Sequence, residues 1–559
     1  MGTASAFAAL AVMGTGGRAA MAPTAVRMSL AAFSQDQDRV RSLRRGIAAM
    51  KALPASDHRS WFFQAATHAY SDTLLKAEFK RDPKVKKVDR AKYWNQCPHF
   101  GQCSADFLIW HRAFLHHFEV NLRVLAGDPD LSLPYWNYCL AEQRTFPEIF
   151  APEFVDQART VRNPLYHPNR ERSFTRGLLE ISAAISQAEK TVGSDNFFHE
   201  VGTTGFGGDD LAAGATQIGL LEQRPHNDIH LAVGGVINST NGAMAEITTA
   251  AFDPVFWVHH ANIDRMWAEW ASKPGKRWGP LPPDSWFDER PWIFLDVDGN
   301  EQTPSRREAM ALVADYDIHY PQVLTLTPLA PAIVAAAPPP ADAATAAEAP
   351  PPAGATRAEP PRAAAMAPRT AAAPRPAMKR ARPPGAEERV ILADHRSLTL
   401  TPRNSGVRKF AAEQQAAPVA DHERAPRQAA PALPVLVAPD LSSPNAKVLL
   451  ELAGITFKRV PSSGFAVYLD SGSTLSSEPV GLIDIFGASH QRGGTMKMAG
   501  MPSTKAVQRF DVTKIVTASA GPFALRVEPY DLLVTKAGTP ALMRGDAVHI
   551  GTVRFVVVG

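Results

Sequence analysis

A long segment rich in proline and alanine lies in the middle of this chain, at residues 328–388. It contains no aromatic side chain. The run "AAAPPPADAATAAEAPPPAG" is typical of it. Such a segment buries too little apolar surface to offset the conformational entropy that is lost on ordering. We therefore expect an extended, mobile linker over residues 326–388 that joins two separately folded domains.

The part before the linker, residues 36–325, is dense in tryptophan, phenylalanine and histidine. Apolar residues recur there with the spacing of amphipathic helices, as in "SADFLIWHRAFLHHFEVNLRVL" and "DPVFWVHHANIDRMWAEWAS". Helices of this kind bury their apolar faces against one another. We expect a mainly α-helical domain with a four-helix bundle core, preceded by an N-terminal extension over residues 1–35.

The part after the linker changes to the two-residue period of β-strands. Short runs rich in β-branched residues, such as "KVLLELAGITF", "GFAVYLDSG" and "VHIGTVRFVVVG", alternate with Gly, Pro and Ser. This pattern is typical of an antiparallel sandwich or barrel. We expect a β-rich domain over residues 389–559, interrupted by a flexible loop at 411–443 whose composition is similar to that of the linker.

The composition excludes several classes of function. Of the 559 residues, 45% are hydrophobic and 20% are charged, and the formal net charge is only +4. No apolar run approaches the roughly 18 residues that a membrane span needs. No basic stripe indicates binding to nucleic acid. The charge pattern leaves the partner open, and the oligomeric state is open as well.

Two further features bear on the cellular compartment. The three cysteines, Cys97, Cys103 and Cys139, are too few for a disulfide framework. The apolar run "SAFAALAVMG" lacks the positive residues that open a secretory signal, since Arg18 comes only after it. An exported protein and a cytoplasmic protein are both compatible with this sequence.

Histidines interrupt the apolar faces of the expected helices. In "RPHNDIH", His226 and His230 stand four residues apart, so a helix turns both imidazoles to one side. In the helix expected to begin at Pro254, His260 shares a buried stripe with Phe256. A buried imidazole needs either a hydrogen bond or a metal ion. Spacing alone leaves both interpretations open.

The first half of the helical part repeats this pattern. His111 interrupts the apolar stripe of a helix expected from about residue 104, and His68 ends the aromatic run "SWFFQAATHAY". Two helices that each turn one histidine inward, together with a histidine from the loop between them, would make a three-histidine metal site. A second helix pair would make another. Asp264 is expected to orient a metal ligand or to pair with an arginine such as Arg112.

Two stretches resemble the metal-site signatures of one known family. "FLIWHRAFLHHFE" is similar to the pattern F-L-x-W-H-R-x-x-L-x-x-x-E, and "DPVFWVHHANID" is similar to D-P-x-F-W-x-x-H-x-x-x-D, with "PHNDIH" between them in the expected order. On these motifs, residues 36–325 resemble tyrosinases and catechol oxidases, the type 3 copper proteins. The β-rich part, with "RFDV" and "VLLELAGI", resembles more loosely the C-terminal domain of plant polyphenol oxidases.

The resemblance implies two copper ions as cofactors and dioxygen as co-substrate. Carried over by position, the ligands are His68, His99 and His111 for the first copper, and His226, His230 and His260 for the second. Six neutral imidazoles without a carboxylate or a thiolate suit copper. The implied substrates are phenols and catechols, with monophenols hydroxylated to o-diphenols and o-diphenols oxidised to o-quinones.

The segment around His99 departs from the family pattern. The second histidine of the first copper site usually stands nine residues before the third, where this chain has Gln102, whereas His99 stands twelve residues before His111. Cys97 supplies the C-x-H spacing at which some members of the family link the cysteine to this histidine by a thioether. A disulfide between Cys97 and Cys103 is the opposing interpretation, and a zinc module around Cys97, His99 and Cys103 is a third.

Three further residues bear on which reaction is catalysed. Glu222 and Asn227 stand where relatives hold a water molecule that takes the proton of a phenol, which favours monophenol hydroxylation. By resemblance, Ile247 matches the position that gates the pocket over the first copper in the family, so we expect a fairly open pocket. Oxidation of catechols alone, or dioxygen carriage as in haemocyanins, are the alternatives. The β-rich domain is expected to shield the site until the linker is cut or displaced.

Overall fold

The computed structural model describes most of the two parts of the chain on either side of the linker. The described residues are 26–98, 105–186, 193–200, 202–208, 218–238, 240–320, 388–401, 406–412, 435–436, 446–486, 507–519, 522–539 and 547–558. The predicted linker up to residue 387, most of the predicted loop at 411–443, His99, Gln102 and Cys103 lie outside the described residues.

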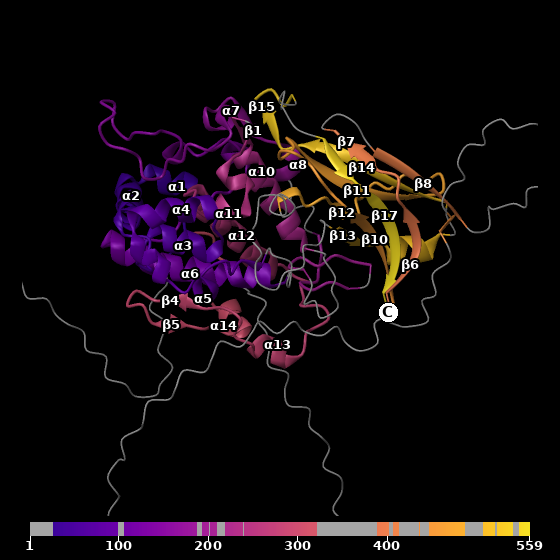
Figure 1. The fold of residues 1–559 in the computed structure, drawn as a ribbon, viewed down its shortest axis with the longest axis horizontal. Helices are drawn as coiled ribbons and strands as arrows, with labels where there is room; N and C mark the ends of the chain where they lie inside the picture. Colours follow the sequence, from indigo (N-terminus) through magenta and orange to yellow (C-terminus); the bar gives the residue numbers. More distant parts are fainter. Residues whose placement is uncertain are drawn as a thin grey trace, which may run out of the picture.

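Figure 1 shows a helical part, coloured from indigo to magenta, beside a β-rich part coloured orange and yellow. This confirms the predicted change from helices to strands along the chain, whereas the four-helix bundle stays a prediction. The helices are α1 (Leu30–Gln35), α2 (Gln37–Ala52), α3 (Trp61–His68), α4 (Asp72–Arg81), α5 (Arg90–Tyr93), α6 (Asp106–Ala126), α7 (Arg172–Thr175), α8 (Ala183–Ser186), α10 (Asp228–Gly234), α11 (Ile247–Ala250), α12 (Val255–Ser272), α13 (Asp284–Asp288), α14 (Arg306–Met310) and α16 (Thr513–Ala518). Within the described ranges, no helix combines the length and the apolar character that crossing a membrane requires.

The strands are mostly short, and those of the helical part form only small ladders. They are β1 (Leu179–Ile181), β2 (Val236–Ile237), β3 (Thr240–Asn241), β4 (Phe294–Leu295), β5 (Glu301–Gln302), β6 (Glu388–Asp394), β7 (Leu398–Leu400), β8 (Gly406–Ala412), β9 (Val435–Leu436), β10 (Lys447–Ala453), β11 (Ser463–Ser471), β12 (Gly481–Leu482), β13 (Val507–Asp511), β14 (Phe523–Asp531), β15 (Leu533–Thr535), β16 (Val548–Ile550) and β17 (Thr552–Val558). The pairs β2–β3 and β4–β5 are two-stranded and antiparallel.

Helix α6 is the central helix of the candidate site, and local sequence explains its end and its packing. It stops where Gly127 adopts a φ of 61°, the left-handed conformation that glycine takes without steric cost. Helix α2 approaches α6 closely at Gly46, since a Cβ there would lie 2.6 Å from Leu122 Cδ1 and 3.3 Å from the Leu122 carbonyl oxygen. A larger residue at 46 would therefore push the two helices apart.

The second histidine-bearing helix, α12, begins one residue later than the sequence predicted. Its first residue is Val255, whose amide donates a hydrogen bond of 2.9 Å to Asp253 Oδ1. The same carboxylate accepts hydrogen bonds from Arg170 at 2.8 and 2.6 Å. Asp253 therefore satisfies one of the open amides at the start of the helix and also ties the helix to an earlier loop.

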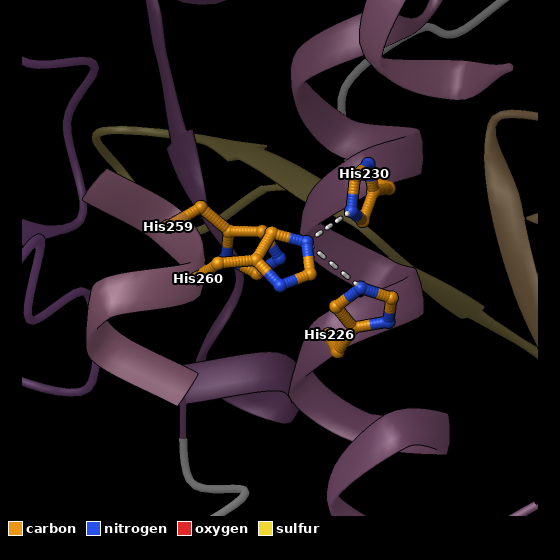
Figure 2. A group of neighbouring side chains, drawn as sticks. All are labelled: His226, His230, His259 and His260. Atoms are coloured by element: carbon orange, nitrogen blue, oxygen red, sulfur yellow. Dashed lines mark hydrogen bonds between the residues drawn. The ribbon is translucent and has the colours of Figure 1, made fainter. Parts of the chain in front are cut away.

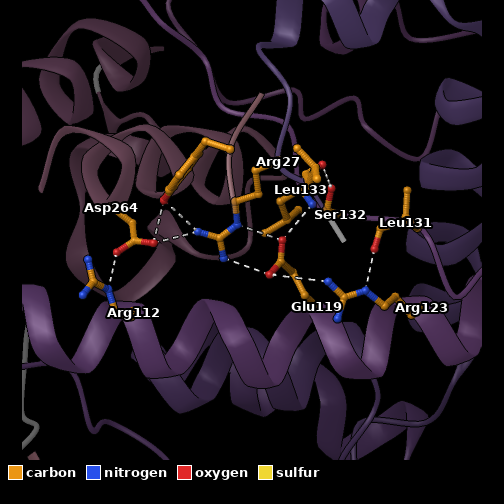
Figure 3. Close-up of polar contacts among 10 residues, drawn as sticks. Arg27, Arg112, Glu119, Arg123, Leu131, Ser132, Leu133 and Asp264 are labelled. Carbon is orange, nitrogen blue, oxygen red and sulfur yellow. Dashed lines mark hydrogen bonds and ion pairs between the residues drawn. The ribbon is translucent and has the colours of Figure 1, made fainter. Parts of the chain in front are cut away.

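The segment predicted as an N-terminal extension belongs to the helical part from residue 26 onward. Leu30 of α1 is buried, and Arg27 is only 2% exposed. Figure 3 shows Arg27 between α6 and α12, where it donates to both oxygens of Glu119 at 3.0 and 2.8 Å and to Asp264 at 2.8 Å. One buried arginine beside a six-residue helix has no periodic signal, so the sequence did not indicate that these residues pack on the helical part.

Two larger sheets form most of the β-rich part, beside the two-stranded antiparallel pair β16–β7. Their strand orders are β13-β10-β17-β6 and β12-β11-β14-β8-β9, and every pair in them is antiparallel except β8–β9. Leu450 of β10 lies opposite Phe555 of β17. Phe555 contacts Phe410 of β8 with ring centroids 5.3 Å apart, which joins one sheet to the other. The inner faces of the two sheets therefore share one apolar core.

The helical and β-rich parts touch directly. Strand β1 pairs antiparallel with β15, with Glu180 opposite Val534. The Gly202 amide also donates a hydrogen bond of 2.7 Å to Asp511 Oδ2 at the end of β13. These contacts fix one face of the β-rich part against the helical part.

Candidate metal centre

Three histidines meet between α10 and α12, as Figure 2 shows. His226 lies in the π-helical turn η5 (Glu222–Asn227), and His230 follows one turn later in α10, so both imidazoles face α12. His260 projects from α12 between them. Its Nε2 lies 3.3 Å from Nε2 of His226 and 3.3 Å from Nε2 of His230. All three rings are buried.

Hydrogen bonds at the other ring nitrogens orient two of these rings. Nδ1 of His226 lies 2.8 Å from Asn227 Oδ1, and Nδ1 of His230 lies 2.9 Å from the Met244 carbonyl oxygen. Because both partners are acceptors, each Nδ1 carries the proton and each Nε2 presents a lone pair. Two lone pairs therefore point toward His260 Nε2, an arrangement that a cation between the three nitrogens would stabilise.

The spacing of these nitrogens fits a single metal ion. Imidazole nitrogens bind a metal at roughly 2.0–2.1 Å, so two of them at a tetrahedral angle lie about 3.3 Å apart. Burial, and then the neighbouring His111 and His226, lower the pKa of His260 well below its usual value. The ring is therefore neutral at pH 7, as a metal ligand must be. Three neutral imidazoles are a donor set that suits copper.

His259 lies beside this group and is buried. Its ligand nitrogen lies within 4.8 Å of those of His226, His230 and His260. Its Nδ1 lies 3.1 Å from the hydroxyl of Tyr138, and its ring stacks on His226 with centroids 5.3 Å apart. The doublet of histidines in α12 was the only sequence signal for it.

A second cluster forms from α3, α6 and the loop between them. The ligand atoms of His68, Cys97 and His111 all lie within 4.8 Å of one another. Nδ1 of His111 donates to the Phe107 carbonyl one turn back at 2.8 Å, which leaves its Nε2 for a ligand. The Cys97 amide donates to the His68 carbonyl at 3.3 Å and so holds the loop against the end of α3. His99, the predicted third ligand, lies outside the described residues.

The two clusters are in direct contact. The rings of His111 and His260 stack with centroids 4.2 Å apart and 13° between their planes. Phe256 packs on both clusters, with ring centroids 4.1 Å from His260 and 4.9 Å from His68. Two metal ions held by these clusters would therefore be neighbours in a buried, aromatic-lined site.

The other predicted site residues lie around these clusters. Glu222 is buried at the start of η5. Asn227 lies at the end of η5, and its Oδ1 accepts the hydrogen bond from His226 Nδ1. Asp264 accepts a hydrogen bond of 2.6 Å from Arg112 Nε, so this pair connects α12 to α6 behind the histidines. Ile247 begins α11 and is buried, and its role as a gate stays a prediction.

The β-rich part reaches the histidines with two side chains that the sequence did not single out. Phe486 stacks on the ring of His230, with centroids 4.1 Å apart and 19° between the planes. Asp484 Oδ1 accepts a hydrogen bond of 3.1 Å from Asn227 Nδ2. A phenylalanine in a short apolar run has the sequence signature of an ordinary core residue, so only the fold reveals this contact.

Comparison with known proteins identifies the domain that holds the histidine clusters. A family model described as the common central domain of tyrosinase matches residues 58–273. Tyrosinase HcTyr1 of Hahella sp. (strain CCB-MM4) is 32% identical over 275 residues, which cover 46% of this chain and 55% of that protein. The chloroplastic polyphenol oxidase of Spinacia oleracea is 28% identical over 261 residues, which cover 42% of this chain and 37% of that protein. The solved structure of latent apple tyrosinase aligns with 18% identity over 96% of this chain and 98% of that chain, with a TM-score of 0.49.

The chain thus spans about half or less of the length of these two curated relatives. The matched range, residues 58–273, includes both clusters from His68 to His260. Their nitrogen donors can hold two neighbouring metal ions. Residues 58–273 therefore belong to the tyrosinase central-domain family, whose cofactor is a pair of copper ions.

Proposed function

We propose that this protein oxidises phenols with dioxygen, hydroxylating monophenols to o-diphenols and oxidising o-diphenols to o-quinones. The observation that carries the proposal is the convergence of Nε2 of His226, His230 and His260 at 3.3 Å beside a second cluster. The names of the Hahella tyrosinase and the spinach polyphenol oxidase support it. Bound copper would supply the redox chemistry with dioxygen, and the protein would bind and orient the phenol.

In this proposal each copper ion has three histidine ligands. The described residues supply five of them, His68 and His111 on one side and His226, His230 and His260 on the other. His99 completes the set by the family pattern alone. Cys97 Sγ lies 3.9 Å from His111 Nε2, so this cysteine borders the first copper site. A thioether between Cys97 and His99 stays a prediction, and a Cys97 peptide that is freely alkylated would contradict it.

The ring of Phe486 marks where a phenol would lie. A substrate ring in its place would stack on His230, as Phe486 does at 4.1 Å. Asn227 and the buried Glu222 would hold a water molecule that accepts the phenol proton, so that the substrate binds as phenolate. In the covered state Asn227 Nδ2 is occupied by Asp484.

Copper stoichiometry and oxygen uptake test this function in the full chain. The copper-loaded protein should hold two copper ions per chain and consume oxygen when a simple catechol is added. A single metal equivalent, or a protein that binds zinc in preference to copper, would contradict the dicopper assignment. Comparing a monophenol with its catechol separates hydroxylation from catechol oxidation alone.

We further propose that the β-rich domain keeps the enzyme latent, because Phe486 fills the phenol position and Asp484 engages Asn227. In the full chain, Phe486→Ala should raise catechol turnover by about tenfold or more, as when the open state is a minor species. Limited proteolysis between residues 328 and 388 should also raise catechol turnover, because it frees the β-rich domain from its covalent link to the helical domain. Leu475→Ala, at a side chain of the same domain that is 72% exposed, is the matched control and should leave turnover unchanged.

Dioxygen carriage is the second candidate, and the covered site favours it, because a carrier must exclude phenols. The two candidates predict different behaviour once the cover is removed. If neither Phe486→Ala nor cleavage of the linker allows catechol turnover while reversible oxygen binding persists, the carrier is supported and the enzyme is not.

A further inference from the structure

The β-rich domain holds a second aromatic ring against the helical domain, next to the histidines. Tyr530 of β14 donates its hydroxyl hydrogen to Asp228 Oδ1 at 2.7 Å. The guanidinium carbon of Arg224 lies 4.1 Å from the centre of the Tyr530 ring, a cation–π contact. The phenol group of Tyr530 is therefore bound by two side chains of the helical domain, by Asp228 at its hydroxyl and by Arg224 at the face of its ring.

Arg224 and Asp228 are held in place independently of Tyr530. Arg224 Nε donates to Asp228 Oδ2 at 2.8 Å, and Asp228 is only 2% exposed. This arrangement leaves Asp228 Oδ1 to the hydroxyl of the ring. Arg224 Nη2 is buried and has no hydrogen-bond partner among the described residues. Such buried donors are rare, so a ligand with an oxygen acceptor beside its hydroxyl would complete the site better than Tyr530 does.

This pair lies next to the metal centre. Asn227 and Asp228 are consecutive residues and line one small cavity under the β-rich domain, together with Leu231 and Tyr530. Asn227 is also hydrogen-bonded to His226. The cavity therefore joins Asp228 to Asn227, the residue that contacts a histidine of the candidate metal centre. The covering domain thus inserts two rings, one at the histidines and one at this pair.

We propose that Arg224 and Asp228 form a binding site for the second phenolic ring of a two-ring phenol. This inference rests on the proposed function, since the first ring is the one that reacts at the histidine clusters. When the β-rich domain is displaced, Asp228 accepts the hydrogen bond of the second hydroxyl and the Arg224 guanidinium covers the ring. The pair takes no part in the chemistry and selects among substrates. A one-ring catechol does not reach it.

Replacing Tyr530 in the full, copper-free chain tests whether the pair recognises a phenol. Tyr530→Ala removes the ring from between Arg224, Asp228 and Gly464, and p-cresol should bind in the space and raise the melting temperature. Toluene, which lacks the hydroxyl, should bind at least about tenfold more weakly. The wild-type chain, in which Tyr530 fills the space, should show neither effect.

A second substitution identifies the group responsible. Tyr530→Ala with Asp228→Asn should lose the preference for p-cresol over toluene. Tyr530→Ala with Asp470→Asn, which removes a carboxylate from an arginine pair elsewhere in the β-rich domain, should keep it. Tyr530→Ser serves if the alanine variant does not fold. Equal binding of the two ligands, or no binding, would overturn the proposal, and this result does not depend on copper.

Turnover supplies the second test, in the copper-loaded chain cleaved between residues 328 and 388. The kcat/KM for a two-ring phenol is divided by that for a simple catechol. Arg224→Gln should lower this ratio about fivefold. Tyr530→Phe, which changes only the covering domain, should leave it as in the wild type. An unchanged ratio in Arg224→Gln would overturn the proposal, whereas absent catechol turnover would count against the proposed function and leave the p-cresol result standing.

Discussion

At the scale of single residues, one hydrogen bond decides which nitrogen each histidine offers to a metal. His111, His226 and His230 each use Nδ1 toward an acceptor, at 2.8, 2.8 and 2.9 Å. Two of these acceptors are backbone carbonyl oxygens, those of Phe107 and Met244. Every one of these rings therefore presents Nε2, and the metal site is oriented before any metal binds.

Removing one of these rings should empty one metal position. We expect His260→Gln to bind one copper ion fewer than the wild type and to lower catechol turnover by roughly a hundredfold or more. Loss of a residue that only hydrogen-bonds to a metal ligand already lowers activity by up to about a hundredfold, and loss of the ligand itself should cost at least as much. Elemental analysis and oxygen uptake measure both effects. His116→Gln, on α6 but in neither cluster, is the control and should keep both copper ions. Full copper content in His260→Gln would contradict the ligand assignment.

Glu222 should matter more for monophenols than for catechols. If it helps to hold the water that takes the phenol proton, Glu222→Gln should lower monophenol hydroxylation by about a hundredfold and catechol oxidation much less. The rates are compared after cleavage of the linker. Glu180→Gln, in β1, is the control and should change neither rate. An equal loss with both substrates would indicate that Glu222 only supports the fold.

At the scale of elements, a buried charge network ties α6 to α12, the two helices that carry His111 and His260. Arg27 bonds to Glu119 of α6 and Asp264 of α12, and Asp264 also accepts from Arg112 of α6. Because buried charges are stable only when they are paired, this network fixes the two helices relative to each other. A segment before the predicted domain thus positions part of the metal centre.

Breaking this network should cost far more than breaking a surface pair. Arg27→Ala leaves the buried Glu119 carboxylate with the Leu133 amide at 2.8 Å and with one distant cation, Arg123 at 4.0 Å. It should lower the free energy of unfolding by about 3–5 kcal/mol. Arg81→Ala, which removes a 77% exposed arginine from its pair with Glu78, should cost less than about 1 kcal/mol. Urea denaturation compares the two variants. If both variants lose less than about 1 kcal/mol of unfolding free energy, Arg27 does not hold α6 and α12 together.

Acid should weaken the same network. Burial alone would raise the pKa of Glu119 and Asp264, but the charges and hydrogen bonds of Arg27 and Arg112 outweigh it and lower both pKa values. Folded pKa values below the unfolded values, about 4, stabilise the protein above that pH, and the stabilisation is lost as the pH falls further. We expect a steeper loss of stability below about pH 4.5 in the wild type than in Arg27→Ala. Parallel curves from urea titrations would contradict this.

At the scale of the whole molecule, the two parts divide the work. The helical part supplies the candidate metal ligands among the described residues. The β-rich part places Phe486 on His230 and Tyr530 on the neighbouring Asp228. Pairing of β1 with β15 holds this cover at one edge. The residues that cover the site and the candidate metal ligands therefore lie in different segments of the chain. The β-rich part can move or change without altering the histidines.

Weakening the strand pairing should loosen the cover. Proline at position 534 has no amide hydrogen for the β1–β15 ladder, so Val534→Pro should raise catechol turnover of the uncut, copper-loaded chain severalfold. Lys536→Pro is the control, because residue 536 is the second residue of the turn closed by the Gly538 amide and the Thr535 carbonyl, where proline is tolerated. Unchanged turnover in Val534→Pro would mean that this edge does not hold the cover.

The sequence by itself determined the order of helical and β-rich parts and most of the candidate ligands. Helical and strand periods are local properties, and spacings such as that of His226 and His230 place side chains on one face whatever surrounds them. Only the tertiary structure decided that His259 joins His226, His230 and His260, and that Arg27 packs between the helices of the helical part. It also decided that Phe486 and Tyr530 lie over the candidate site. These contacts join residues far apart in the chain or depend on how rings turn within a packed core, and neither leaves a periodic pattern in the sequence.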